Sequence, residues 1–478
     1  MATLTTVPVG SLPFERFETV LDGSEYGRLL DAVLRGRELL AGRVIWNVNS
    51  TARGGGVAEL LSSVLAYARG AGVDVRWEVI AGNPEFFAIT KRIHNWLHGA
   101  PGDGGPLGAE ERDVYEATLD ANARDLCEVV GDRDVVILHD PQTAGMVTAL
   151  KARHIRVIWR CHVGLDTPNE HARRAWQFLL PYVRQADRYV FSRRAFAWPQ
   201  LEAERIAVIA PVIDVYSPKN QELAPPVVDA ILARAGIQAG GDHGEAVFIR
   251  EDGSPGRVDR HATVYQERPV GRDEAMVLQV SRWDRLKDPL GVIQGFARHV
   301  APRTGAHLVY AGPAVEAVSD DPEGRAVLDE AFDAWRRLSP PVRERVHLAC
   351  LPMDDPEENG AMVNALQRRA DVVVQKSLAE GFGLTVAEAM WKARPVVASR
   401  VGGIQEQIAG PECGVLLDDP HDLAAFGAAV EERLVDVEGS ARMGAAARER
   451  VRAHFLDTRS LFDYLDLVAS LIPRPCAS

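Results

Sequence analysis

One segment near the C-terminal end of the chain restricts the possible fold more than any other. It contains an apolar run at 372–374, a turn with two glycines, a helical stretch that ends before Pro395, and a second apolar run at 396–398. Two short strands joined through one helix form a βαβ unit, and such a unit requires a parallel sheet. Ligands of open parallel sheets bind at the carboxyl ends of the strands, so we expect the turn over 377–383 to face a ligand.

Short apolar runs alternate with helical periodicity along the rest of the chain, which predicts an α/β protein with doubly wound parallel sheets. A chain of 478 residues is too long for one hydrophobic core. We therefore predict two Rossmann-like domains, 1–215 and 216–455, the second with an insertion at about 240–272, and a C-terminal helix in 456–478 that packs back across the domain junction. The predicted strands lie at 43–48, 73–80, 135–138, 155–159, 188–191, 206–209, 276–280, 308–311, 346–351 and 371–375.

Charge and composition exclude several classes of protein. The net charge of −13 argues against binding to nucleic acid or to a membrane surface. Five cysteines are scattered without a C-x-x-C pair, which is typical of a reducing compartment and gives no zinc signature. No apolar run has membrane-spanning length and no signal-peptide pattern opens the chain, so we expect a cytoplasmic protein. The sequence leaves the oligomeric state open, a homodimer included.

A glycine-rich turn follows the first predicted strand of the N-terminal half. Gly54, Gly55 and Gly56 precede a helix that begins near Val57. Glycines at this position let the backbone approach a phosphate or a sugar closely, and the helix N-terminus attracts an anion. No G-K-[ST] follows, so this is not a phosphate-binding loop of the Walker type. An ordinary tight turn explains the three glycines about equally well.

Polar residues follow several predicted strands where the ligand crevice should lie. His139 and Asp140 follow the strand 135–138, and His162 follows the strand 155–159. A single histidine after a strand is usually structural, but three polar residues at two neighbouring strand ends indicate a site. The D-x-D sequence at 132–134 lies at the opposite, amino end of its strand, so we interpret it as a turn rather than as a metal site.

Two cations and two carboxylates in the C-terminal half could hold a charged ligand. Arg282 and Lys287 follow a predicted strand and would neutralise a diphosphate without a metal, together with the helix N-terminus at 381–385. Glu380 precedes that helix and Glu388 lies a full turn inside it. We therefore reject a glycosidase-like pair of carboxylates and expect each to accept a hydrogen bond from a different hydroxyl group.

The spacing of Glu380 and Glu388 within S-L-A-E-G-F-G-L-T-V-A-E-A-M, with S-R-x4-K upstream, resembles the retaining GT-B glycosyltransferases of family 4. The resemblance covers nearly the whole chain and is strongest to the trehalose-forming members. It implies two domains that face a central cleft. The blocks that carry it are 47–60, 138–142, 159–162, 280–289 and 372–390.

This resemblance implies that glucose is transferred from a nucleoside diphosphate glucose, with ADP, UDP or GDP as nucleotide, to glucose. The product would be α,α-trehalose, formed with retention and reversibly, with no metal and no other cofactor. The alternatives are a retaining trehalose phosphorylase and a family 4 enzyme with another acceptor sugar. The sequence offers no clear nucleophile, so front-face attack is expected, with the leaving phosphate taking the proton of the acceptor.

The resemblance also implies roles for individual residues. Arg282 and Lys287 would hold the diphosphate, Glu380 would bind hydroxyls of the donor sugar, and Glu388 would bind the ribose. His162 would lie beside the reacting centre. The further substrate-binding residues are Gly55 and Gly56, His139 and Asp140, and the backbone amides of Gly381, Phe382, Gly383, Leu384 and Thr385.

Overall fold

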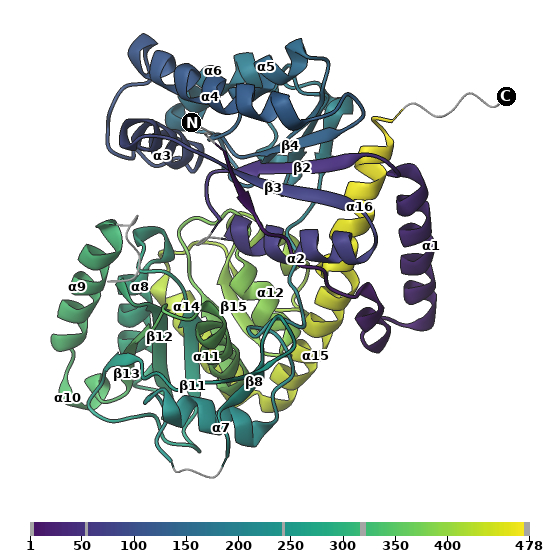
Figure 1. Cartoon of the computed structure of the whole chain (residues 1–478). Coiled ribbons are helices and arrows are strands. Elements are labelled where there is room, and N and C mark those ends of the chain that lie inside the picture. Colours follow the sequence, from purple (N-terminus) through teal and green to yellow (C-terminus); the bar gives the residue numbers. More distant parts are fainter. Residues whose placement is uncertain (1–3, 53–55, 241–243, 316–321, 473–478) are drawn as a thin grey trace. The chain divides into compact units, whose positions relative to one another are not determined.

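The computed structural model describes residues 4–52, 56–240, 244–315 and 322–472. It divides into two compact units, the first formed by Met1–Val212 with Leu456–Ser478 and the second by Ile213–Phe455. Each unit is built around one seven-stranded sheet (Figure 1). Among the described residues no helix is both long and apolar enough to cross a membrane.

The sheet of the first unit is parallel except for one edge strand. Its strand order is β1-β3-β2-β4-β5-β6-β7, and β1 pairs antiparallel with β3. After β2 the chain adds β3 on one side of β2 and then returns to add β4 on the other side. The strand order therefore reverses between β2 and β4. The strands are β1 (Leu4–Val7), β2 (Val44–Asn49), β3 (Asp74–Ile80), β4 (Val135–His139), β5 (Arg156–Cys161), β6 (Arg188–Phe191) and β7 (Ile206–Val208).

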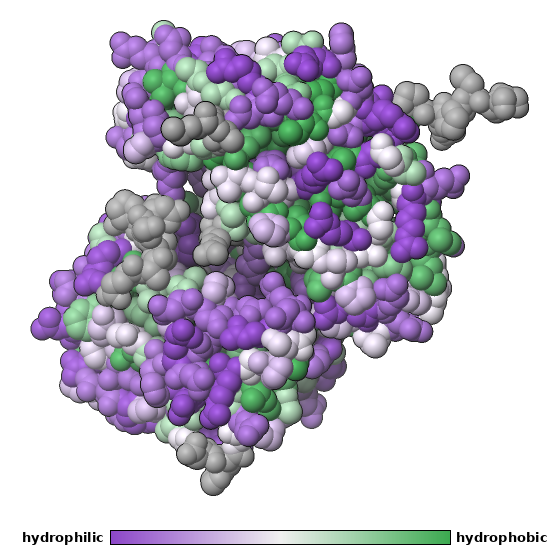
Figure 2. All heavy atoms as spheres, viewed as in Figure 1, coloured by the Kyte–Doolittle hydropathy of each residue, from purple (hydrophilic) through white to green (hydrophobic). Residues whose placement is uncertain are grey.

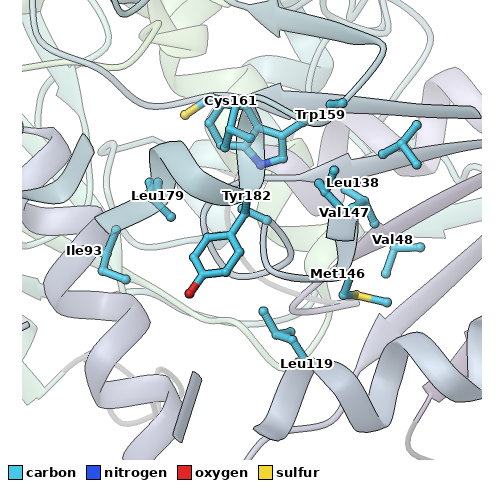
Figure 3. Packing of buried hydrophobic residues seen from close by; sticks show 14 of the residues in the cluster. Val48, Ile93, Leu119, Leu138, Met146, Val147, Trp159, Cys161, Leu179 and Tyr182 are labelled. Carbon is cyan, nitrogen blue, oxygen red and sulfur yellow. The ribbon is translucent and has the colours of Figure 1, made fainter. Parts of the chain in front are cut away.

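Alternate residues of these strands pack against two different layers of helices. Trp46, Val48 and Leu138 face the cluster formed with α3 to α6, part of which Figure 3 shows. Ile45 and Ile137 face the cluster formed with α1, α2 and α16. Strands buried on both faces are expected to be mainly apolar, and these are, apart from buried polar residues such as Asn47 in β2 and Arg160 in β5. The helices are α1 (Gly23–Leu39), α2 (Gly56–Gly70), α3 (Pro84–Leu97), α4 (Ala109–Val129), α5 (Met146–Ala152), α6 (Glu170–Val183) and α16 (Asp457–Ala469).

The second unit has the strand order of a Rossmann fold. The order is β10-β13-β12-β11-β14-β15-β16, with only β10 antiparallel, and it reverses between β11 and β14. The strands are β10 (Thr263–Tyr265), β11 (Met276–Val280), β12 (His307–Pro313), β13 (Val346–Leu351), β14 (Val372–Gln375), β15 (Val396–Ser399) and β16 (Val415–Leu417). The α-helices are α7 (Pro225–Arg234), α8 (Pro289–Gly295), α9 (Pro322–Arg336), α10 (Pro340–Arg343), α11 (Pro356–Arg369), α12 (Leu384–Trp391), α13 (Ile404–Gln407), α14 (Leu423–Val435) and α15 (Val437–His454).

The segment predicted as an insertion contains short antiparallel strands. The strands β8 (Val247–Ile249) and β9 (Pro255–Arg257) form a separate two-stranded sheet, and β10 extends the main sheet through β13. Arg250 attaches the hairpin to the N-terminus of α11, because its guanidinium lies 2.8 Å from Asp355 and 2.5 Å from Glu357.

The visible surface carries mostly hydrophilic side chains, with hydrophobic residues among them (Figure 2). Large exposed apolar side chains are few among the described residues, and two of them, Leu30 and Leu34, belong to α1. Single exposed leucines of this kind are normal on a folded protein and indicate no binding site by themselves.

Candidate active site

The reversal of strand order in the second unit places a set of polar residues at one sheet edge. Ser281 and Arg282 follow β11, and the neighbouring strand β14 is followed by Lys376, Ser377 and Glu380. Ligands of such sheets bind outside the carboxyl ends of the strands at this reversal point. The predicted donor residues therefore lie where the fold provides a crevice.

Glu380 is buried, and its carboxylate is held by three donors that share one oxygen. Lys287 Nζ lies 2.5 Å from Oε1, the Ser377 hydroxyl donates to it at 2.8 Å, and Gln375 Nε2 donates at 3.2 Å. The ammonium group offsets the cost of burying the negative charge. Within the described chain Oε2 has no such partner, so this oxygen can accept a hydrogen bond from a ligand hydroxyl.

A network of amides and hydroxyls below Glu380 fixes its position. Gln375 Nε2 also donates to Ser281 Oγ at 3.0 Å, and its Oε1 accepts from the Thr385 hydroxyl at 3.0 Å. Gln279 Nε2 donates to the carbonyl of Lys287 at 2.8 Å. Sequence reasoning did not identify Gln279, Gln375 or Ser281. The signal was present, because both glutamines interrupt otherwise apolar strands just before the crevice.

The loop that leads into α12 depends on glycines behind it. Gly402 has a φ of 51°, and a Cβ there would lie 1.9 Å from the carbonyl oxygen of Glu380. The N–H of Gly403 donates to the carbonyl of Gly381 at 3.0 Å, so that carbonyl points toward the backing segment. Gly383, with a φ of 81°, caps α12 without a side-chain bond.

The amide groups of residues 381–385 have no hydrogen-bond partner in the described part of the chain. Leu384 and Thr385 begin α12, Gly383 caps it, and residues 381 and 382 lead into it, so these amides lie at the helix N-terminus, where the helix dipole favours an anion. The aromatic ring of Phe382 packs against Phe455, with ring centroids 5.8 Å apart, and the hydroxyl of Thr385 is used by Gln375. Only backbone atoms of Phe382 are therefore available to a ligand.

The two predicted cations, Arg282 and Lys287, differ in their surroundings. Lys287 is mostly buried beside Glu380, whereas the side chain of Arg282 is 54% exposed and lies 3.1 Å from Asp284. Arg282 follows β11, and because its side chain is largely exposed it can turn toward a bound anion. A third cation, Lys376, is fully buried and pairs with Asp288, and it serves the structure rather than a ligand.

Glu388 lies one turn inside α12 and has partners different from those of Glu380. Lys219 Nζ lies 3.6 Å from its Oε1, while its Oε2 is buried without a hydrogen-bond partner among the described residues. Lys392, one turn further on, donates to Asn220 Oδ1 at 2.9 Å. Burial lowers the pKa of Lys392 well below its usual value, and the nearby Glu388 opposes this shift. Sequence reasoning missed Lys219, Asn220 and Lys392.

The first unit gathers His139, Asp140 and His162 at its own strand reversal. His139 Nδ1 lies 3.2 Å from His162 Nε2, and the Asp140 carboxylate accepts a hydrogen bond from the backbone N–H of His162 at 2.7 Å. Asp140 has a φ of 65°, a strained conformation for a residue with a side chain. The sequence prediction that these three residues come together agrees with this geometry.

Burial strongly affects the ionisation of this cluster. It lowers the pKa of His139 to about 3 and that of His162 well below its usual value, and the charge of Arg160 lowers both further. Burial raises the pKa of Asp140 to about 7, against the opposing effects of the His162 N–H and of Arg160. Both imidazoles are therefore neutral near pH 7.

Two other predicted features can be placed. Gly55 lies outside the described residues, and Gly56 is the exposed first residue of α2. Asp134 accepts hydrogen bonds from the N–H of Val44 at 2.9 Å and from the indole of Trp46 at 3.0 Å. The interpretation of the D-x-D sequence as a structural turn is therefore confirmed.

Comparison with known proteins agrees with both halves of this description. Residues 47–198 match the family described as "Trehalose synthase, N-terminal domain", and residues 356–450 match "Glycosyl transferases group 1". The chain is 36% identical to a trehalose synthase of Rubrobacter xylanophilus over 98% of its own length and 99% of the relative. It is 32% identical to a trehalose synthase of Pyrococcus horikoshii, over 97% of each chain.

Among solved structures, the one described as "Trehalose-6-phosphate from E. coli bound with UDP-2-fluoro glucose" superposes with a TM-score of 0.66 at 13% identity. The match covers 91% of this chain and all of that one. The two parallel-sheet units thus define a glycosyltransferase of the GT-B fold, as the sequence predicted. Within that class, the chain belongs to the trehalose synthase family.

Proposed function

We propose that this chain is a retaining glucosyltransferase that forms α,α-trehalose from a nucleoside diphosphate glucose and glucose, and that the reaction is reversible. The observation that carries the proposal is the arrangement of the residues in the second unit that are predicted to bind the sugar nucleotide. Lys287 and Glu380 form a buried pair 2.5 Å apart directly beside unpartnered amides at the start of α12. A sugar diphosphate needs both a hydroxyl acceptor and a concentration of positive charge.

Each part of the donor has a matching group. The diphosphate is held by Arg282, by Lys287 and by the amides of 381–385, since charge-assisted hydrogen bonds are the strongest available to it. Oε2 of Glu380 accepts from a hydroxyl of the glucose, and the unpartnered Oε2 of Glu388 accepts from the ribose.

The acceptor is assigned to the first unit. Its proposed contacts are His139, Asp140 and His162, and the glycine turn with Gly55 and Gly56 is proposed to bind a phosphate. The neutral imidazole of His162 lies beside the reacting centre, where it can donate or accept a hydrogen bond but carries no charge.

In this proposal the leaving phosphate, rather than a carboxylate of the chain, takes the proton of the acceptor. Glu380 has its charge engaged by Lys287, so it is suited to binding rather than to nucleophilic attack. The acceptor hydroxyl attacks on the face that the nucleotide leaves, and its proton passes to the leaving phosphate. Arg282 and Lys287 stabilise the charge that develops on that phosphate in the transition state. The reaction needs no metal in this scheme.

The test is to incubate the enzyme with trehalose and, separately, with ADP, UDP, GDP or inorganic phosphate. A nucleoside diphosphate glucose is the expected product with at least one nucleotide. Formation of glucose 1-phosphate from phosphate alone would contradict the proposal and support a phosphorylase. Synthesis from a nucleotide sugar with some other acceptor, but never with glucose, would contradict the choice of acceptor.

The role of the cations is tested by Arg282→Ala with a matched control. Arg285→Ala removes a guanidinium with the same 54% exposure three residues away, but one that pairs with Glu330 at 2.7 Å. Loss of turnover in Arg282→Ala, with Arg285→Ala close to wild type, supports diphosphate binding. Equal turnover in both variants would refute it.

A further inference from the structure

A fully buried guanidinium lies next to the histidines of the first unit and has no carboxylate partner among the described residues. Arg160, in β5, donates from Nη2 to the carbonyl of Ile209 at 3.3 Å and from Nη1 to the hydroxyl of Tyr464. Its third contact is from Nε to His162 Nδ1 at 3.4 Å. Burying a charge is costly unless it makes hydrogen bonds, so these contacts require an explanation beyond packing.

The contact with Arg160 determines how the histidines share their protons. A guanidinium can only donate, so His162 Nδ1 must accept and His162 Nε2 must carry the hydrogen. His162 Nε2 then donates to His139 Nδ1 at 3.2 Å, and His139 Nε2 donates to Asn47 Oδ1 at 3.0 Å. One direction of donation accounts for all three contacts, and it allows only neutral imidazoles.

Tyr464 connects this chain of bonds to the C-terminal helix α16. Besides accepting from Arg160, its ring lies 5.4 Å from the guanidinium carbon, a cation–π contact. The contact joins two residues 304 positions apart. The other ionisable groups around the cluster are Asp140 on the His162 backbone and Asp463 beside Arg160 on α16.

We propose that Arg160 is the positioning residue for His162 and that Tyr464 holds Arg160 in place, so that α16 is required to complete the acceptor site. Arg160 acts through His162 rather than on the substrate: it fixes the ring orientation and the tautomer. The proposal rests on the proposed function, in which His162 contacts the reacting sugars.

The first experiment follows the protonation of His162 directly. Enzyme labelled with ¹³C at the histidine Cε1 is titrated by NMR between pH 5 and pH 8, with His162→Gln used to assign the signal. In the wild-type enzyme His162 should not titrate. In Arg160→Gln the nearby charge is gone and Nδ1 loses the donor that holds it as an acceptor, so the pKa of His162 should rise, although burial still lowers it, and the Cε1 signal should move from its wild-type position. A His162 signal that coincides with the wild-type signal throughout this pH range in folded Arg160→Gln would overturn the proposal, whether or not trehalose synthesis has been demonstrated.

The second experiment measures catalysis. In Arg160→Gln, kcat/KM for glucose should fall by about 10- to 100-fold, because a misplaced catalytic contact costs this much. The KM for the nucleotide sugar should stay close to wild type. Tyr464→Phe keeps the ring and removes only the hydroxyl, so it tests the same link if Arg160→Gln does not fold.

Arg156→Gln is the matched control. Arg156 opens the same strand, and its Nε also donates to the C-terminal segment, at the carbonyl of Leu471 at 3.2 Å, but none of its hydrogen bonds reaches the histidines. If the effect were only a loosened C-terminal helix, Arg156→Gln and Arg160→Gln would lower kcat/KM for glucose equally. That result, or a Tyr464→Phe enzyme with wild-type kinetics and a wild-type His162 signal, would contradict the proposal. Absence of trehalose synthesis in every variant and in wild type would refute the proposed function instead.

Discussion

Replacing Lys287 by Met should destabilise the second unit as well as abolish turnover. The substitution keeps most of the apolar side chain and removes only the ammonium group, which lies 2.5 Å from Glu380 Oε1. The side chain of Glu380 is only 6% exposed, so its carboxylate would stay buried with Ser377 and Gln375 as the remaining donors.

The size of the effect follows from these contacts. Removing one partner of a buried ion pair costs about 3–5 kcal/mol, because the other charge is left uncompensated. Since two neutral donors remain and Lys287 is 17% exposed, we expect a loss of about 3 kcal/mol in the free energy of unfolding. The double variant Lys287→Met with Glu380→Gln removes the charge as well and should recover about 2 kcal/mol of this loss.

The assay is denaturant unfolding of the wild type, both single variants and the double variant, with activity measured in parallel. Arg303→Ala is the control, because its pair with Glu431 is exposed and should contribute less than about 1 kcal/mol. We expect the double variant to regain stability without activity. If Lys287→Met costs less than about 1 kcal/mol, or if the double variant is no more stable than the single one, the reasoning about the buried pair is refuted.

Three further predictions concern packing, nucleotide binding and pH. Gly36→Ala should raise stability by about 1 kcal/mol, because its Cβ extends into an apolar cavity of about 100 Å³ and stops 3.5 Å from a leucine of α16. Gly70→Ala should instead unfold the protein at lower temperature, since its Cβ would lie 1.8 Å from a carbonyl oxygen; equal melting temperatures would contradict both. Glu388→Gln should weaken calorimetric binding of the nucleoside diphosphate by about tenfold or more and leave glucose binding unchanged, whereas equal losses for both ligands would exclude a ribose contact. The pKa of Asp140 is raised from 3.8 to about 7, so the folded state retains a proton that the unfolded state loses. This carboxyl therefore contributes stability that is lost as pH rises between these values, whereas the lowered pKa values of His139 and His162 act in the opposite sense. Asp140→Asn removes only the first contribution, so its stability relative to wild type should increase as pH rises from 3.8 to about 7 in urea unfolding measured at several pH values, and a constant difference would contradict the assignment.

Much of the fold could be predicted from the sequence because most strands are apolar on both faces. A run such as 372–374 has no polar residue at any position, and only a sheet covered by helices on both sides buries it fully. The short edge strands β1, β10 and β16 were not predicted. They have three or four residues each, and their conformation depends on the neighbouring strand rather than on a pattern of their own.

The residues of the donor site could be predicted, but not their pairing. Lys287 and Glu380 each follow a strand, and the rule for parallel sheets places both at the same edge. That they form a buried ion pair depends on the neighbouring position of β11 and β14, which the strand order establishes and the local sequence does not. The predicted cations were treated as equivalent, whereas the structure gives Arg282 an exposed position.

The role of Arg160 illustrates the same limit in the first unit. Arg160 directly follows the apolar run at 155–159. An arginine in the core of a sheet indicates that a buried partner exists, since the buried charge is otherwise too costly. The partner is Tyr464, which is 304 residues away, and no local pattern identifies it. Only the return of α16 to the first unit brings the two together.

The central claim is that the chain transfers glucose from a nucleotide to glucose with retention of configuration. The most direct measurement supplies nucleoside diphosphate glucose labelled with ¹³C at C1, together with unlabelled glucose, and follows the products by NMR. Our account predicts α,α-trehalose labelled in one ring only, with the labelled carbon in the α configuration. A labelled β linkage would contradict retention, and labelled glucose or glucose 1-phosphate without labelled trehalose would contradict the proposed transfer itself.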